Sequence, residues 1–176
     1  VTLEEIENSA KFGEPADEAV ATLVAALNEE AGIGTWDYIR SPGNLPDVSL
    51  QDFIRNAIIY KPAAVVPQGA STALGDQSEP GEAFAEAREP IAQAFVPVGG
   101  GRPFTVVGNH FKSKGSAAGL PGDEDQGDGQ GASNATRTAQ AQALRDWVAG
   151  LAASNGVEDV FLQGDFNSYS RKTRST

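Results

Sequence analysis

The chain has 176 residues, with 24 acidic and 13 basic side chains and a formal net charge of −11. Its length suits one domain over residues 1–176, and its 40% hydrophobic content excludes wholesale disorder. No apolar run approaches the roughly 20 residues of a membrane span, and we expect no secretory signal within this chain. The absence of cysteine excludes disulfides and thiolate metal sites.

The first half of the chain predicts a strand, a helix and a second, buried strand. Residues 1–8 are typical of a strand that runs into a turn. A helix follows Pro15 and Asp17, because apolar residues recur at helical spacing until Gly32. These residues are Val20, Leu23, Val24 and Leu27.

Between this helix and the middle of the chain, loop and strand alternate. Residues 40–47 indicate a loop, and residues 56–61 indicate a buried strand that 64–67 could continue. Residues 68–87 are rich in Gly, Ala and Glu, so they predict a surface loop or a short helix.

The second half predicts a hairpin followed by a crossover. Residues 91–98 and 104–111 pair across a glycine-rich turn, and residues 112–133 form a long loop of the kind that is often functional. A helix begins near Ser133 or Asn134 and ends at Asn155–Gly156, and a last strand covers "VFLQGD". The helix has its apolar face at Leu144, Trp147, Val148 and Leu151.

Polar side chains follow the two strands on either side of this crossover. If the strands are parallel, His110, Asp165 and Asn167 meet at one sheet edge, where ligands bind in such sheets. Histidine suits general acid or base work, and a carboxylate can orient or deprotonate water. The structural alternatives are an Asx turn for Asp165 and Asn167, and an exposed or structural histidine.

Other charged residues are candidates for metal or phosphate binding. Glu5, close to the end of the first strand, could bind Mg²⁺, which takes one or two carboxylates in proteins. Arg88 and Arg137 could each clamp a phosphate, although surface arginines are common. The alternative for the acidic segment around Glu5 is a solvated turn.

The segment "GDEDQGDGQG" (122–131) places Asp123, Asp125 and Asp128 among glycines. This pattern indicates either a calcium or second metal site, or a flexible acidic loop. It lacks the closing glutamate of an EF-hand.

Seven segments together carry a family resemblance over essentially the whole chain. They are "LEEIENS", "NAIIYKP", "REPIAQAF", "NHFKSKGS", "GDEDQGDGQG", "NATR" and "GDFNSY". In this order and spacing they resemble the endonuclease/exonuclease/phosphatase superfamily with its deoxyribonuclease I-like fold. They are most similar to its secreted or cell-surface bacterial nucleases.

The resemblance implies an α+β fold, a four-layer α/β/β/α sandwich that is incomplete at both ends. It also implies a Mg²⁺- or Mn²⁺-dependent hydrolase of DNA, or of RNA, located outside the cell. His110, Asp165 and Asn167 match the catalytic set, and Glu5 matches the metal-binding glutamate. Four residues match phosphate-binding or buttressing positions: Arg88, Asn109, Lys114 and Arg137.

The chain also departs from the family. The family's upstream Asn-rich strand is absent, as are its downstream metal-site Asp and final Asp-His pair, so we expect a middle portion with little activity by itself. An unpaired sheet edge would favour self-association. Two alternative functions stay open: a phosphatase of the same superfamily acting on phosphomonoesters, inositol phosphates or phospholipid headgroups, and a noncatalytic calcium-binding surface domain.

Overall fold

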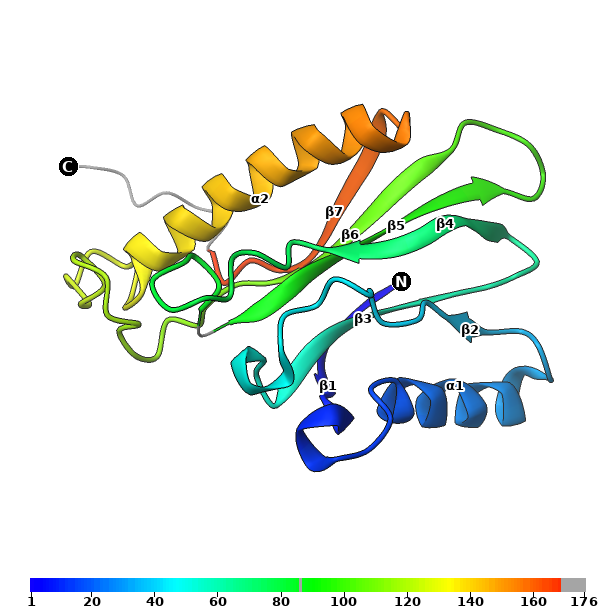
Figure 1. Ribbon diagram of the computed structural model, residues 1–176, viewed down its shortest axis with the longest axis horizontal. Coiled ribbons are helices and arrows are strands. Elements are labelled where there is room, and N and C mark those ends of the chain that lie inside the picture. Colours follow the sequence, from blue (N-terminus) through cyan, green and yellow to red (C-terminus); the bar gives the residue numbers. More distant parts are fainter. Residues whose placement is uncertain (86, 169–176) are drawn as a thin grey trace.

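A computed structural model describes residues 1–85 and 87–168 of the chain. Two β-sheets lie face to face, with helix α1 (Glu18–Ala31) covering the outside of one sheet and α2 (Asn134–Asn155) covering the other (Figure 1). These layers form the α/β/β/α sandwich that the sequence predicts.

The first sheet has three antiparallel strands in the order β1-β3-β2. They are β1 (Thr2–Glu7), β2 (Asp37–Tyr38) and β3 (Ile54–Tyr60). Two 3₁₀ helices adjoin this sheet: η1 (Ser9–Phe12) follows β1, and η2 (Val48–Leu50) precedes β3.

The second sheet has four strands in the order β4-β5-β6-β7. They are β4 (Val65–Ala73), β5 (Arg88–Pro97), β6 (Phe104–His110) and β7 (Asp159–Asp165). The β5–β6 hairpin is antiparallel, whereas β6 and β7 are parallel and joined through α2. The predicted hairpin and crossover are therefore confirmed.

Three apolar clusters hold the layers together. Ile58 of the first sheet packs against Ile91 and Phe95 of the second. The outer clusters join α1 to β3 and α2 to the second sheet. Their buried residues include Val20, Val24, Ala57 and Ile59 on one side, and Ala92, Val107, Leu144 and Leu151 on the other. Each fully buried valine, leucine or isoleucine among them contributes about 1.5–3 kcal/mol.

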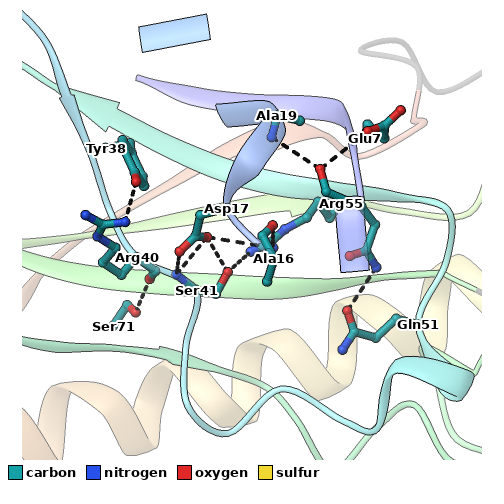
Figure 2. A network of polar contacts seen from close by, with 12 residues as sticks. Glu7, Ala16, Asp17, Ala19, Tyr38, Arg40, Ser41, Gln51, Arg55 and Ser71 are labelled. Atoms are coloured by element: carbon teal, nitrogen blue, oxygen red, sulfur yellow. Dashed lines mark hydrogen bonds and ion pairs between the residues drawn. The ribbon is translucent and has the colours of Figure 1, made fainter. Parts of the chain in front are cut away.

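Polar contacts fix the start of α1 against β3. Arg55 donates from Nη1 to the carbonyl oxygen of Ala16 at 2.8 Å and from Nη2 to Oγ of Ser41 at 2.7 Å (Figure 2). The carboxylate of Asp17 accepts from the main-chain nitrogen of Ser41 at 3.1 Å and lies 3.9 Å from Arg55. This half-buried network joins the start of the helix, the loop before β3 and the strand itself.

One expectation for the first half of the chain was wrong, and one strand was missed. Strand β4 continues to Ala73, so residues 68–73 are neither loop nor helix. It is an edge strand with a bulge between Gln68 and Thr72, which explains why its side chains lack a clear apolar alternation. The short strand β2 was not predicted, since two residues carry no periodicity.

Among the residues described, no helix combines the length and apolar character of a membrane span. Phe161 and Leu162 of β7 are exposed at the edge of the second sheet. Self-association through this edge stays a prediction.

Candidate active site

Three of the predicted residues stand in one row across the second sheet. Arg88 of β5 is paired with His110 of β6, and His110 is paired with Asp165 of β7. Paired residues on neighbouring strands share a face, and the strands are about 4.8 Å apart. Residues far apart in sequence therefore place a cation, an imidazole and a carboxylate side by side.

Gly164 allows this row to form. Its φ of +125° lies in the region that favours glycine, and a Cβ atom at this position would lie 1.9 Å from the carbonyl oxygen of Asn109. No side chain fits there, so the glycine is what permits β7 to approach β6 so closely next to Asp165.

The carbonyl oxygen of Phe111 joins the arginine to the amide. It accepts from Nη2 of Arg88 at 3.1 Å and from Nδ2 of Asn167 at 3.0 Å. The main-chain nitrogen of Phe111 donates to the carbonyl oxygen of Asp165 at 2.9 Å. One residue after β6 thus positions side chains from β5 and from the segment after β7.

Asp165 and Asn167 also form the Asx turn that was the structural alternative. Oδ1 of Asp165 accepts from the main-chain nitrogen of Asn167 at 2.7 Å, and Asn167 adopts a left-handed φ of 47°. The turn and a role in a site are compatible, because the turn leaves Asp165 exposed at the sheet edge.

The segment just before β3 contributes a carboxylate that sequence reasoning missed. Oδ2 of Asp52 lies 3.6 Å from Nη1 of Arg88, which is only 8% exposed. Asp52 stands two residues before β3, whose start pairs with the end of β1, where Glu7 faces Ile54. An acidic residue just before a predicted buried strand was the available signal.

Glu5 lies where β1 is distorted. The β1–β3 register shifts between Leu3 and Ile6, and Glu5 has a φ of 58° and an exposed side chain. The regular alternation of side chains along a strand therefore does not determine which face of the sheet the Glu5 side chain points to. An acidic side chain held in the left-handed region is uncommon and consistent with a functional position.

The charges of these residues act on one another. Burial lowers the pKa of the Arg88 guanidinium, and the carboxylates of Asp52, Glu5 and Asp165 oppose that shift. Burial and the charge of Arg88 lower the pKa of His110, again against the three carboxylates. His110 is 5% exposed, and a lowered pKa favours its neutral imidazole at pH 7.

Two predicted phosphate-binding residues serve the scaffold. The amide of Asn109 is fully buried and donates to the carbonyl oxygens of Val107 and Gln163. Arg137 is buried and donates to the carbonyl oxygens of Lys112, Ala132 and Gln130. These contacts describe buttresses of β6 and of the loop after it, and direct phosphate contact by either residue stays a prediction.

Lys114 lies in the same loop and within electrostatic range of the row. Burial and the charge of Arg137 lower the pKa of its ammonium group, whereas Asp165 raises it. Its carbonyl oxygen accepts from the main-chain nitrogen of Ala132 at 3.2 Å. The loop therefore brings a second cation toward Asp165.

One aspartate of the acidic loop at residues 122–131, Asp123, has a structural role. Asp123 is fully buried and accepts from the main-chain nitrogen and hydroxyl of Thr136 and from the main-chain nitrogen of Leu120. Burial would raise its pKa, but these hydrogen bonds outweigh burial and leave the pKa lowered. Asp125 and Asp128 each cap an exposed turn. Calcium binding by these residues stays a prediction.

The carboxylates near the row suit a hard divalent cation that takes only one or two of its ligands from the protein. In the described part of the chain, no group of three or more His, Cys, Asp or Glu side chains could enclose a metal ion. Mg²⁺ and Mn²⁺ do not need such a cage, since one or two carboxylates with water and substrate oxygens suffice. Glu5 is one of the exposed carboxylates of the first sheet, and metal binding by it stays a prediction.

Comparison with known proteins finds solved structures of similar fold but no protein of similar sequence. No model of a protein family matches the chain, and no curated protein matches it. The human Nocturnin catalytic domain with bound sulfate matches with a TM-score of 0.56 and 14% identity, over 97% of this chain and 52% of that one.

Two further solved structures match at similar levels. An endonuclease/exonuclease/phosphatase family protein from Bacteroides thetaiotaomicron has a TM-score of 0.53 and 16% identity, over 84% of this chain and 46% of its own. ANGEL2, a 2′,3′-cyclic phosphatase in complex with adenosine-2′,3′-vanadate, has a TM-score of 0.53 and 14% identity, over 96% of this chain and 40% of its own. The chain thus spans about half the length of these structures, and the resemblance predicted from its motifs is confirmed at the level of the fold.

Proposed function

We propose that this chain carries part of the site of a metal-dependent phosphodiesterase that hydrolyses nucleic acid, with DNA as its substrate, in a secreted or cell-surface protein. The observation that carries the proposal is the row of Arg88, His110 and Asp165, paired across three strands. A cation, a neutral imidazole and an exposed carboxylate are the groups that phosphodiester hydrolysis needs.

Each residue has a chemical part in the proposed reaction. Arg88 binds a non-bridging phosphate oxygen, since guanidinium recognises such oxygens in bidentate fashion. Asp165, oriented by its contact with Asn167, positions the attacking water and accepts its proton. His110, held neutral, donates a ring N–H hydrogen bond to the phosphate, and the leaving O3′ takes its proton from solvent. A new P–O bond forms to water and the P–O3′ bond breaks, which gives a 5′-phosphate and a 3′-hydroxyl.

Glu5 would hold Mg²⁺ or Mn²⁺, which supplies Lewis-acid stabilisation of the phosphate charge when bound. The remaining tasks belong to the chain itself. Asp52, just before β3, holds the guanidinium of Arg88 from one side, and the carbonyl oxygen of Phe111, just after β6, holds it from the other. A guanidinium fixed from two sides loses little entropy when it binds phosphate.

The solved structures support phosphate-ester chemistry. Nocturnin is seen with sulfate and ANGEL2 with an adenosine vanadate, and both ligands contain oxyanions of the size of phosphate. Because ANGEL2 is a cyclic phosphatase, hydrolysis of small phosphate esters is the second candidate. Since the chain spans half the length of these structures, activity is proposed for the complete polypeptide that contains it.

The test compares substrates and variants in that complete polypeptide. With Mg²⁺, we expect cleavage of a labelled DNA oligonucleotide to exceed hydrolysis of p-nitrophenyl phosphate and of inositol phosphate, and chelation of the metal to abolish it. Asp165→Ala should reduce cleavage by about 10²–10⁴-fold, the usual contribution of a general base. Asp159→Ala, at the start of the same strand, is the control and should retain activity. Equal activity of the two variants would refute the assignment.

A further inference from the structure

Two exposed phenylalanines form a pair, one at the end of η1 and the other just before β3. Phe12 is 59% exposed and Phe53 is 60% exposed, and their ring centroids are 5.9 Å apart with an angle of 50° between the planes. Single exposed apolar residues are ordinary, but contiguous ones with a polar rim mark interaction surfaces. We call Phe12 and Phe53, with Lys11, the aromatic platform.

Hydrogen bonds fix the platform in place. Nζ of Lys11 donates to the carbonyl oxygens of Val48 at 2.8 Å and Ser49 at 3.2 Å, and it lies 5.4 Å from the ring centroid of Phe53. The η1 helix is thereby locked to η2. A cation over one ring adds positive charge at the edge of an otherwise apolar surface.

Asn8 fixes the backbone of Phe53 from the other side. Its main-chain nitrogen donates to the carbonyl oxygen of Phe53 at 2.9 Å, and its Nδ2 donates to Oε1 of Gln51 and to the carbonyl oxygen of Asp52 at 2.9 Å. Asn8 is only 1% exposed. The ring of Phe53 therefore projects from a rigid support, and binding to it costs little conformational entropy.

The platform is next to residues of the candidate active site along the chain. Phe53 directly follows Asp52, whose carboxylate contacts Arg88, and consecutive Cα atoms are about 3.8 Å apart. Phe12 ends the 3₁₀ helix that follows the strand bearing Glu5. Both rings thus belong to segments that each supply one acidic residue to the site.

We propose that the aromatic platform stacks an unpaired nucleobase next to the scissile phosphate, which makes single-stranded nucleic acid the preferred substrate. This inference rests on the proposed function. Aromatic rings stack on the face of any base, so the contact tolerates every sequence, whereas the base faces in a duplex are already stacked. A nucleobase fits this place because Arg88 would hold the phosphate of the same strand nearby.

The test measures binding of a fluorescein-labelled single-stranded DNA oligonucleotide by anisotropy at one fixed salt concentration, with Ca²⁺ and Mg²⁺ absent to prevent cleavage. Phe53→Ala should weaken binding by about tenfold, which corresponds to about 1.4 kcal/mol. Phe161→Ala is the matched control, because Phe161 is 53% exposed on β7 and away from the platform, and it should bind like the wild type.

An abasic oligonucleotide of the same length separates stacking from a structural effect. This oligonucleotide keeps the phosphates and lacks the bases. The wild type should therefore bind it about tenfold more weakly than the normal strand, whereas Phe53→Ala should bind both strands with the same affinity. Phe53→Leu keeps the apolar volume but removes the ring, and it should behave like the alanine variant. A leucine variant with wild-type affinity, or additive losses with the abasic strand, would overturn the inference.

Failure of the inference is distinguishable from failure of the proposed function. If the wild type binds single strands but Phe53→Ala binds them equally well, the platform is not a stacking site and the hydrolytic proposal stands. If the wild type binds no oligonucleotide, the inference is overturned, and if it also cleaves none once Mg²⁺ is restored, the proposed function is overturned as well.

Discussion

At the scale of single residues, the candidate site depends on close backbone approach as much as on its charged groups. Gly164 has no room for a side chain beside Asn109, and Asn167 takes a left-handed conformation directly after the strand. These two positions determine where Asp165 lies relative to His110.

Substitution of Gly164 tests this dependence. Gly164→Ala should destabilise the fold by about 3 kcal/mol or more, because the new Cβ meets main-chain atoms and φ is unfavourable. Urea unfolding measures the loss. The control is Gly150→Ala in α2, where a Cβ meets nothing within 4 Å. This variant should raise the free energy of unfolding by less than about 1 kcal/mol. Similar losses for the two variants would contradict this account.

Sequence patterns could identify most of the catalytic candidates. Gly-Asp-x-Asn and the lone histidine stand after apolar strands, and the parallel pairing of those strands follows from the helix between them. Asp52 could not be assigned in this way, because its contact with Arg88 joins two sheets and has no local signature. The distortion of β1 at Glu5 is equally a product of pairing rather than of local sequence.

At the scale of elements, the spacing of apolar residues predicted the amphipathic helices but missed the second half of the edge strand β4. The helices α1 and α2 present the expected apolar faces, with Val24 and Leu144 among the buried residues. Strand β4 pairs on one side only, so its sequence carries Gly, Ser and Gln where a central strand would carry apolar residues.

The loop between β6 and α2 is anchored by a buried aspartate. Asp123→Ala should lower the free energy of unfolding by about 2–4 kcal/mol, because it leaves the buried main-chain nitrogen and hydroxyl of Thr136 without their acceptor. Asp125→Ala, in the exposed part of the loop, should change it by less than about 0.5 kcal/mol. Denaturation with and without Ca²⁺ completes the test. A stabilisation by Ca²⁺ that Asp125→Ala abolishes would show instead that the loop is a calcium site.

At the scale of the whole molecule, a net charge of −11 opposes the approach of a polyanion. The second sheet and its following loop offset this locally with Arg88, Lys112 and Lys114. Binding of nucleic acid should therefore be local and sensitive to salt, with the base contact at the aromatic platform adding affinity that salt does not screen. The four-layer arrangement places Glu5 of the first sheet and Asp52, just before β3, within electrostatic range of Arg88 in the second sheet.

The most direct test of the central claim is to locate a bound metal ion. Crystals soaked in Mn²⁺ should give an anomalous peak beside Glu5, on the side of Arg88 and Asp165, and the Glu5→Gln variant should lose that peak. This readout does not depend on turnover, so it holds whether or not the chain is active by itself. A peak confined to residues 122–131, or none near Glu5 in the wild type, would contradict the account.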